Sequence, residues 1–335
     1  MGQRNGSSKS TIALSLGDPN GIGPEVLLRA LPDLMTDSYK ILVFGHVGVL
    51  EFWARRMGMG DDFADRFSAV LTVVEPDEPC PPVEIGRATS AGGAASLAYF
   101  RAAVASVLDG RASAVVTNPV SKEASALAGS QYRGHTDLLK DLCNADDCVM
   151  MLANSRLRVA LVTTHIPLGE VPAALSVGRI ERVIRITAVG LRDFGLTSPR
   201  LAVAGLNPHA GEMGLLGTEE IEIIEPAIRR SREAGIDARG PFPADSLFHQ
   251  ADGHKYDAVV AMYHDQGLAP LKALSFKDTV NVTLGLPIIR TSVGHGTGYD
   301  IAGKGIADPT SLICAVRLAE LMAGNRKTRM GRGAV

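Results

Sequence analysis

AVVAMYHDQG, residues 258–267, is the stretch that decides the fold. It starts with a short run of Ala and Val, typical of a strand buried on both faces of a parallel sheet, and continues into a polar loop at His264. The same arrangement occurs twice more, in RVALVTTHIPL (158–168) and LAVAGLNPHAGE (201–212). Because open α/β sheets place their chemistry at the carboxyl ends of strands, these three loops are the first candidates for a functional site.

Each of the three loops carries a histidine, namely His165, His209 and His264. Three neutral imidazoles that converge from strand ends can hold a divalent metal and leave coordination positions open for a substrate. The histidines are far apart along the chain, so only the fold can bring them together. The alternative is that one or more of them satisfies hydrogen bonds in a core, and their spacing leaves both interpretations open.

Short apolar strands alternate with helices along the chain, which predicts an α/β fold with mostly parallel sheets. Two domains sharing a cleft are expected, with the chain crossing between them more than once. Strands are predicted in TIALSLG, KILVFGH, AVLTVVE, SAVVTNP and TVNVTLG, and helices at residues 24–35, 96–110, 176–195, 218–235 and 309–324.

The composition is that of an ordinary soluble globular protein. The chain has 335 residues, a net charge of -2 and 46% hydrophobic residues, which gives no argument for a nucleic-acid partner. Four cysteines without a CxxC pair fit reduced thiols. The polar start MGQRNGSSKS lacks the apolar stretch of a signal peptide, and no apolar run approaches the roughly 20 residues that span a bilayer. We expect a cytoplasmic protein without membrane contact, whose basic end GNRKTRMGRGAV is solvated.

The first predicted strand leads into GDPNGIGPE, residues 17–25. Amides at the start of the following helix could meet an anion or a cofactor, and a purely structural turn is the alternative. The loop matches neither the Rossmann fingerprint GxGxxG nor a P-loop.

Further candidates lie in three later segments. YRGHTDLL (132–139) carries His135 and Thr136 at an expected helix start, where Thr136 is either a ligand contact or an N-cap. Lys122 either faces a substrate or is an ordinary surface lysine. Lys272, Asn281 and Arg290 offer two cations and an amide suited to phosphate. VGHGTGYDIAGKG (293–305) has five glycines and predicts a loop that approaches a ligand closely.

Together these segments resemble the 4-hydroxythreonine-4-phosphate dehydrogenase family of pyridoxal phosphate biosynthesis. The resemblance runs in family order from residue 14 to about residue 311, and NPHAGE, YHDQG and NVTLGLPIIRTS are its most specific parts. The other matching pieces are GDPNGIGPE, YRGHTDLL, VALVTTHIPL, GPFPADSLF, AMYHDQGLAPLK and HGTGYDIAGKGIADP.

The resemblance implies a two-domain α/β/α sandwich similar to isocitrate and isopropylmalate dehydrogenases, without a Rossmann domain. A first domain of residues 1–125 with 268–335 would bind the cofactor and form a cleft wall. A second domain of residues 126–267 would carry the metal site and the dimer interface. The family implies a homodimer whose active sites borrow a residue from the partner subunit.

The family also implies site residues. His165, His209 and His264 match its ligands for a divalent ion (Zn, Mg, Mn or Co), and the oxidant is NAD or NADP. The positions that match for the phosphorylated substrate are His135, Thr136, Lys272, Asn281 and Arg290. The loop that matches a cofactor-contacting region carries His295, Gly296, Thr297 and Asp300. The candidate catalytic residues are Asp245, Asp265 and Lys272.

The expected reaction is oxidation of 4-hydroxythreonine 4-phosphate followed by decarboxylation, in which the metal favours the alkoxide from which hydride leaves. Asp245 and Asp265 would orient ligands or relay protons, and their alternatives are a helix cap and a loop hydrogen bond. The chain departs from the family at Asp137, commonly Glu, and at Gly294, commonly Asp. Alternative functions are therefore dehydrogenation of 4-phospho-D-threonate or 4-phospho-D-erythronate, dehydrogenation of a cis-dihydrodiol dicarboxylate, or non-catalytic binding.

Overall fold

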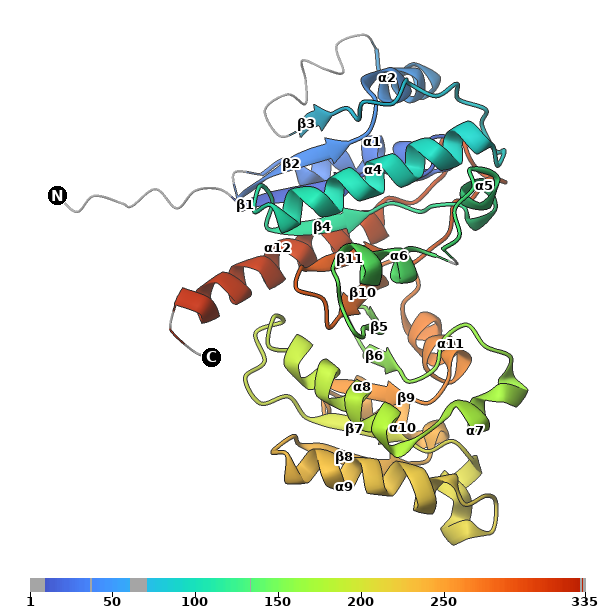
Figure 1. The fold of residues 1–335 in the computed structure, drawn as a ribbon, viewed down its shortest axis with the longest axis vertical. Coiled ribbons are helices and arrows are strands. Elements are labelled where there is room, and N and C mark those ends of the chain that lie inside the picture. Colours follow the sequence, from blue (N-terminus) through green and yellow to red (C-terminus); the bar gives the residue numbers. More distant parts are fainter. Residues whose placement is uncertain (1–9, 37, 61–70, 133, 332, 334–335) are drawn as a thin grey trace, which may run out of the picture. The chain divides into compact units, whose positions relative to one another are not determined.

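The computed structural model divides the chain into two compact units, which Figure 1 shows as a ribbon. Unit 1 comprises residues 1–144 and 288–324, and unit 2 comprises residues 145–287 and 325–335. The boundaries of these units differ from the domain boundaries expected from the sequence. The roles expected for the two domains stay predictions.

The structure describes most of the chain. The N-terminal segment MGQRNGSSKS, in which no signal peptide was expected, lies almost wholly outside the described residues. The described residues are 10–36, 38–60, 71–132, 134–331 and 333.

Unit 1 contains a sheet whose paired strands are all parallel, in the order β3–β2–β1–β4–β11. Its central strands are short, apolar and almost fully buried, as expected for a parallel sheet covered on both faces. The strands are β1 (Ser10–Ser15), β2 (Tyr39–Phe44), β3 (Leu71–Val74), β4 (Ala114–Thr117) and β11 (Arg290–Val293).

Helices cover this sheet. The long helix α4 packs against β1, β2 and β4, and its Tyr99 and Phe100 are fully buried. Within the described ranges, α4 is the one helix long and apolar enough to span a membrane, and half of that stretch is buried inside the protein. The helices are α1 (Gly23–Leu34), α2 (Val47–Arg56), α4 (Ser90–Leu108), α5 (Lys122–Leu127), α6 (His135–Leu142) and α12 (Thr310–Gly331), which continues into unit 2 after Gly324.

Unit 2 contains strands in the order β10–β5–β6–β9–β7–β8. The second strand in this order, β5, runs antiparallel to β10 and β6, whereas β6, β9, β7 and β8 run parallel to one another. The strands are β5 (Val149–Ala153), β6 (Arg158–Leu161), β7 (Leu201–Ala204), β8 (Ala238–Phe242), β9 (Ala258–Ala261) and β10 (Val280–Leu284).

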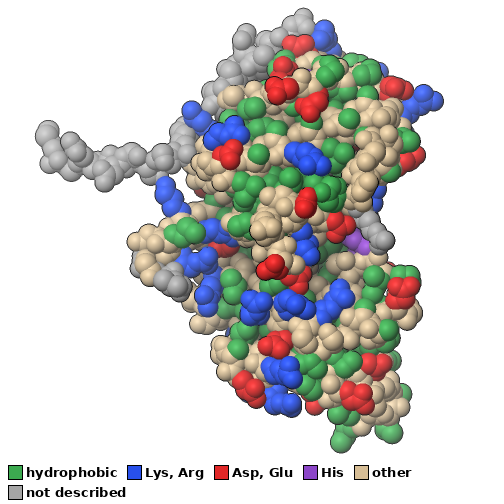
Figure 2. Space-filling view, in the orientation of Figure 1, with side chains coloured by type: hydrophobic (Ala, Val, Ile, Leu, Met, Phe, Trp, Pro, Cys, Tyr) green, Lys and Arg blue, Asp and Glu red, His purple; other side chains and the backbone are tan. Residues whose placement is uncertain are grey.

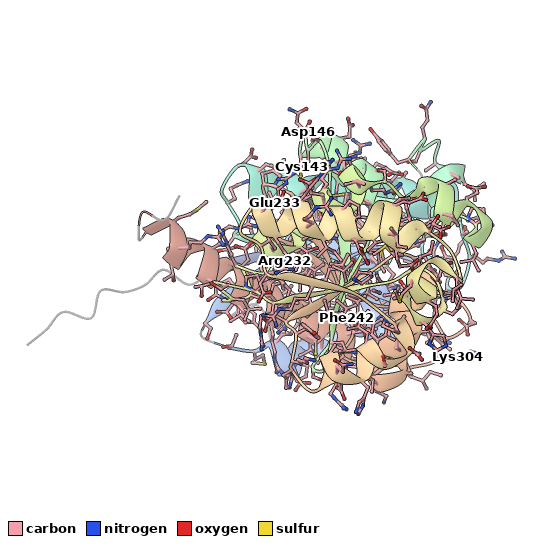
Figure 3. All side chains as sticks on the ribbon, turned by 90° about the horizontal axis from the view of Figure 1, so that it is seen from below. Cys143, Asp146, Arg232, Glu233, Phe242 and Lys304 are labelled. Atoms are coloured by element: carbon pink, nitrogen blue, oxygen red, sulfur yellow. The ribbon has the colours of Figure 1, made fainter. Side chains whose placement is uncertain are left out.

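The helices of unit 2 form two layers. α8 (Val177–Gly190) and α9 (Glu225–Glu233) pack together on one side, and Figure 3 shows Arg232 and Glu233 on α9 and Phe242 on β8. α10 (Ala244–Asp252) and α11 (His264–Leu274) bury Leu247, Phe248 and Leu271 against alternate residues of β6, β9 and β7. The short helix α7 (Val171–Ala174) follows the 3₁₀ turn η1 (Leu168–Glu170).

The predicted α/β class with mostly parallel sheets is confirmed, and several helices differ from their predicted bounds or form. The helix expected at 96–110 begins earlier, at Ser90, and the helix expected at 176–195 ends at Gly190. The helix expected at 218–235 begins with a π-helical turn, η3 (Glu220–Ile224), because Pro226 has no N–H to continue the α-helical hydrogen bonding. The last helix continues past residue 324 to Gly331.

The expectation of a solvated basic end is wrong for two arginines. Arg326 and Arg329 both contact the carboxylate of Asp193, which is only 4% exposed, at 2.5 and 3.0 Å. A buried carboxylate needs such partners, so this part of the tail belongs to the structure of unit 2. Elsewhere, acidic and basic side chains are interspersed over the face shown in Figure 2, in line with the small net charge.

Candidate functional site

The three histidine-bearing loops leave the same edge of the unit 2 sheet. β6, β9 and β7 are neighbours and run parallel, so their carboxyl ends lie side by side. His165 follows β6, His264 begins α11 directly after β9, and His209 follows β7. The expectation that these histidines sit at strand ends is thus met, and their order across the sheet is 165, 264, 209.

His165 and His264 are close to each other. Their ring centroids are 5.7 Å apart, with the planes tilted by 44°. The Nδ1 atom of His264 lies 2.7 Å from Oδ1 of Asp265, which is itself 85% exposed. A proton on Nδ1 shared with this carboxylate leaves the lone pair on Nε2, the atom that then faces a ligand. Asp265 is therefore placed to orient His264.

His209 starts a turn with an uncommon backbone. Five consecutive residues from His209 to Met213 have left-handed φ values of 53°, 52°, 80°, 44° and 56°. This conformation costs a non-glycine residue roughly 1–2 kcal/mol, so contacts elsewhere must hold the turn. Strain of this kind gathers at functional sites.

Hydrogen bonds tie the three loops together. Thr163, two residues before His165, donates its hydroxyl to the Met262 carbonyl at 2.7 Å. The side chain of Gln266 accepts from the Met262 amide at 2.7 Å and donates to the Gly205 carbonyl at 2.6 Å. The ends of β6, β9 and β7 therefore form one connected edge, which limits how far the histidines can move apart.

The donor set suits a divalent transition metal, since imidazoles at neighbouring strand ends are ordinary ligands for such ions. Among the residues that the structure describes, however, no group of three or more His, Cys, Asp or Glu side chains is arranged to hold an ion. The chain by itself brings two of the three histidines together, and the three-histidine site stays a prediction.

The remaining predicted residues of unit 2 have polar groups suited to a ligand. Asn281, on β10, has a buried side-chain oxygen with no hydrogen-bond partner within the described part of the chain. Such an atom ordinarily marks a place for a ligand or water. Lys272, in the last turn of α11, lies over the ring of Phe276 at 5.5 Å. Asp245 is exposed in the first turn of α10 and accepts from the Ser246 amide at 2.9 Å.

The predicted anion-binding residues of unit 1 are Arg290, His135 and Thr136. Arg290 is 3% exposed on β11, and its Nη2 atom donates to the Thr117 hydroxyl at 2.7 Å. His135 begins α6, although its side chain lies outside the described part of the structure. The N-cap of α6 is Gly134, so the alternative role of Thr136 as N-cap is wrong.

Two neighbouring residues from the sequence analysis lie beside this helix start. Lys122 begins α5 and lines a pocket together with Tyr132, Gly134 and Leu138, next to the amino end of α6. Asp137, which departs from the family pattern, is exposed in the first turn of α6.

The glycine-rich loop is fastened to the first loop of the chain. The Thr297 carbonyl accepts from the Ile22 amide at 2.9 Å. The fully buried Glu25 accepts from the amides of Gly303 and Ala307 at 2.9 and 3.1 Å. These bonds use the Ile22 amide at the start of α1 and the Glu25 side chain, so GDPNGIGPE supports the second loop structurally.

A buried acid–phenol pair completes this support. The Tyr299 hydroxyl donates to the Asp18 carboxylate, whose other oxygen accepts from the Asn20 amide at 2.9 Å. Burial raises the pKa of Asp18 above its usual value, while the bonds from Tyr299 and Asn20 lower it in part. Burial and the contact with Asp18 also raise the pKa of Tyr299.

The predicted cofactor residues belong to this supported loop, in which His295 and Thr297 are half-buried and Gly296 is exposed. A Cβ atom at Gly296 would meet nothing within 4 Å, so the backbone there is open to a ligand. Nδ1 of His295 lies 3.0 Å from the Gly296 carbonyl, and Asp300 is exposed. The Gly294 amide is bound to the Ser311 hydroxyl at 2.8 Å.

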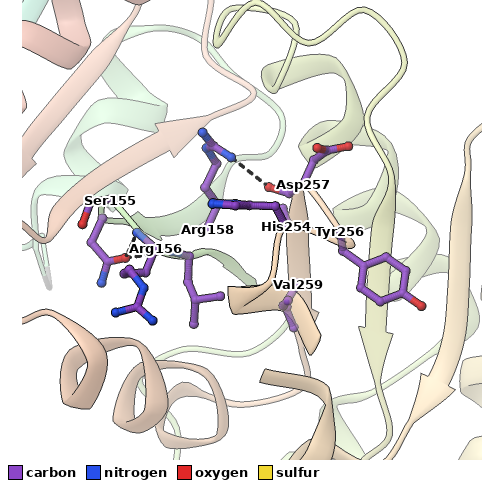
Figure 4. Close-up of a pocket in the computed structure, with 11 residues that line it drawn as sticks. Ser155, Arg156, Arg158, His254, Tyr256, Asp257 and Val259 are labelled. Carbon is purple, nitrogen blue, oxygen red and sulfur yellow. Dashed lines mark hydrogen bonds between the residues drawn. The ribbon is translucent and has the colours of Figure 1, made fainter. Parts of the chain in front are cut away.

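A different pocket lies at the opposite edge of the unit 2 sheet, at the amino ends of β6 and β9 (Figure 4). Its lining includes Arg156, Arg158, His254 and Asp257. Arg156 is bound to the Asp252 carboxylate at 2.6 Å, and Arg158 donates to the Asp257 carbonyl at 3.2 Å. Burial lowers the pKa of Arg158. None of the predicted site residues lines this pocket.

Comparison with known proteins shows the family of this chain. Residues 33–319 match the family described as pyridoxal phosphate biosynthetic protein PdxA. The chain belongs to the PdxA family. A 4-hydroxythreonine-4-phosphate dehydrogenase from Desulforapulum autotrophicum is 45% identical over 94% of this chain and 96% of its own length. Another from Ruegeria is 46% identical over 94% of this chain and 98% of its own length.

Solved structures of relatives share the fold. A 4-hydroxythreonine-4-phosphate dehydrogenase from Klebsiella pneumoniae has a TM-score of 0.83 and 39% identity, covering 95% of this chain and 99% of that one. A terephthalate 1,2-cis-dihydrodiol dehydrogenase from Burkholderia xenovorans has a TM-score of 0.66 and 33% identity, covering 94% and 98%. The resemblance inferred from the motifs is therefore confirmed for the PdxA family.

Sequence reasoning missed the residues that support the site in this PdxA family member. Glu25, Gln266 and Glu220 form buried or bridging contacts, yet each is a common polar residue that is usually exposed. The cluster of glycines at 211, 214 and 217 was a signal for a tight turn after His209. It did not reveal which carboxylate the turn encloses.

Proposed function

We propose that this PdxA family member oxidises 4-hydroxythreonine 4-phosphate with NAD or NADP, in a metal-dependent reaction followed by decarboxylation. The observation that carries the proposal is the placement of His165, His264 and His209 at three neighbouring strand ends. The names of relatives at 45% and 46% identity support this substrate. The proposed activity is that of an oxidoreductase. We propose the cytoplasm as its location.

The three histidines are the groups proposed to hold one divalent ion, either Zn, Mg, Mn or Co. A bound ion would act as a Lewis acid on the substrate hydroxyl and on the oxygen next to it. Asp265 would keep His264 in the tautomer that presents Nε2. The groups proposed to move protons are Asp245, Asp265 and Lys272. Asp265 and Lys272 lie on α11, which begins at His264, and Asp245 lies in the first turn of α10.

The phosphate would be held by Arg290, Asn281, Lys272, His135 and Thr136. Arg290 offers a fixed fork of donors and Lys272 a mobile point charge. The buried oxygen of Asn281 gives a hydroxyl or protonated phosphate oxygen a place to donate. Binding energy from a phosphate remote from the reacting carbon can position that carbon against the nicotinamide.

The cofactor would lie along the glycine-rich loop, on His295, Gly296, Thr297 and Asp300. The open backbone at Gly296 supports this assignment because a ligand can approach it without meeting a side chain. Gly294 stands where the family commonly has Asp, so one negative charge is absent beside the loop.

The protein is proposed to act as a homodimer with an active site shared between the subunits. Four apolar side chains beyond His209, here termed the apolar tip, are exposed: Met213 by 95%, Leu215 by 82%, Leu216 by 47% and Ile221 by 47%. Exposed apolar patches of this kind mark interaction surfaces. A second copy covering the tip would lie beside His209 and could complete its surroundings.

The double variant Met213→Asp/Leu215→Asp is expected to shift the protein from dimer to monomer, because two buried charges would oppose the interface. Light scattering coupled to size-exclusion chromatography measures the mass. Leu127→Asp is the matched control, since Leu127 is 56% exposed on α5 in unit 1. A wild-type protein that is monomeric at all concentrations, or a double variant that stays dimeric, contradicts the proposal.

A substrate panel tests the proposed reaction. Reduced cofactor and released carbon dioxide are followed with 4-hydroxythreonine 4-phosphate, 4-phospho-D-threonate, 4-phospho-D-erythronate and a cis-dihydrodiol dicarboxylate, each with added Zn²⁺, Mg²⁺ or Mn²⁺. The expected result is the highest kcat/KM for 4-hydroxythreonine 4-phosphate, with equal amounts of reduced cofactor and carbon dioxide. Turnover of none of these compounds contradicts the proposal.

The dihydrodiol activity is the second candidate, favoured by the 33% identity to the Burkholderia xenovorans enzyme over 94% of the chain. The same panel separates the two functions. Reduced cofactor formed from the dihydrodiol but from no phosphorylated compound would support the second candidate.

A further inference from the structure

We propose that Glu220 is a positioning residue whose buried carboxylate holds the turn that presents His209. This inference rests on the metal-binding role proposed for His209. Glu220 is 1% exposed. Its Oε1 atom accepts from the backbone amides of Leu206 and Asn207 at 2.7 and 2.8 Å, and its Oε2 atom accepts from the Asn207 side chain at 2.9 Å. Three donors thus fix the chain immediately before His209.

The turn wraps closely around this carboxylate. A Cβ atom at Gly211 would lie 2.6 Å from Oε2 of Glu220, and one at Gly205 would lie 3.1 Å from Oε1. A side chain would therefore crowd the carboxylate on both sides, before and after His209, and most severely at Gly211. The left-handed backbone begins at His209, between these two glycines, and continues past Gly211 to Met213.

The carboxylate acts on His209 more directly than on the other two histidines. Asn207, which donates two of the three hydrogen bonds to the Glu220 carboxylate, is two residues before His209. His165 and His264 are instead fastened through Thr163 and Gln266, whose bonds run to Met262 and Gly205. Loss of the Glu220 carboxylate should therefore disturb His209 while the pair formed by His165 and His264 stays in place.

Glu220→Gln removes the charge and replaces one accepting oxygen with an NH₂ group that faces the Asn207 donor. Cobalt(II) binding is measured on the full-length protein by calorimetry and by absorption of the bound ion. We expect Glu220→Gln to weaken cobalt affinity by roughly 10- to 100-fold, the usual effect of removing a group that orients a metal ligand. Glu222→Gln, on the same π-helical turn but exposed, is the matched control and should bind like the wild type.

The same measurement in a His209→Ala background separates positioning from general stability. If Glu220 acts through His209, adding Glu220→Gln to His209→Ala should change cobalt affinity no further. An equal loss in both backgrounds overturns the inference, and so does wild-type affinity in a folded Glu220→Gln variant. If Glu220→Gln does not fold, Glu220→Asp takes its place, because it keeps the charge on a shorter side chain. Cobalt affinity is then measured with and without His209→Ala, and the same results overturn the inference.

The proposed metal site itself is tested separately. If His264→Ala binds cobalt as tightly as the wild type, the histidines do not form the proposed metal site. Histidine-dependent binding that is unaffected by Glu220→Gln would defeat only the role of Glu220.

Discussion

His264→Ala is expected to lower kcat/KM for the phosphorylated substrate by about 10²–10⁴-fold, because Lewis-acid stabilisation by a metal is worth several kcal/mol. His264 is the central histidine at the strand ends, 5.7 Å from His165 between ring centroids. Metal-dependent formation of reduced cofactor is the measurement. Exhaustive chelation of the wild type should give the same loss and leave the fold intact, since unit 2 has its own apolar core.

Two further variants sharpen this result. His249→Ala should keep wild-type activity, because His249 is exposed on α10 and outside the candidate site. The kcat/KM of Asp265→Asn should lie between those of His249→Ala and His264→Ala, about 10- to 100-fold below the wild type, because the substitution removes the carboxylate that orients His264. Full activity in His264→Ala, or in metal-free wild type, would contradict the metal-dependent mechanism.

Arg290→Ala is expected to raise KM for every phosphorylated substrate by roughly 10- to 100-fold, since a charge-assisted contact is worth about 1.5–3 kcal/mol. The burial of Arg290 adds a second effect. Its guanidinium donates to Thr117 at 2.7 Å, so the alanine variant also leaves a cavity and an unmatched hydroxyl. Thermal unfolding should therefore show a lower Tm.

Arg290→Lys separates these two effects. The variant keeps a positive charge and most of the volume but loses the planar fork of donors. It should have a Tm near that of the wild type and an intermediate KM, while kcat changes less than KM. An unchanged KM for all phosphorylated substrates in both variants would show that Arg290 supports the fold and does not bind the phosphate.

Local patterns in the sequence were sufficient for the strand ends and their histidines. Runs such as AVVA at 258–261 and LAVA at 201–204 are short, apolar and followed by turn residues, so both the strands and the following loops could be predicted. These features depend on neighbours in the chain, and neighbours are visible in a sequence.

The roles of the buried carboxylates could not be predicted in this way. Aspartate and glutamate usually lie at the surface, yet Glu25, Glu220 and Asp193 are buried. Backbone amides surround the two glutamates and arginines surround the aspartate, and these partners come from other parts of the chain. Arg326 and Arg329 find Asp193 more than 130 residues away along the chain. The identity of a residue does not indicate which distant residues will surround it.

By itself, then, the sequence determined the α/β class, the order of strands and helices, and the three loops that end in histidine. The tertiary structure alone decided that these loops leave adjacent parallel strands, and that His165 lies beside His264. It also decided that the turn at His209 is left-handed and closed around Glu220. The physical reason is that strand order and burial are set by packing between segments far apart in the chain, whereas periodicity records only the preferences of adjacent residues.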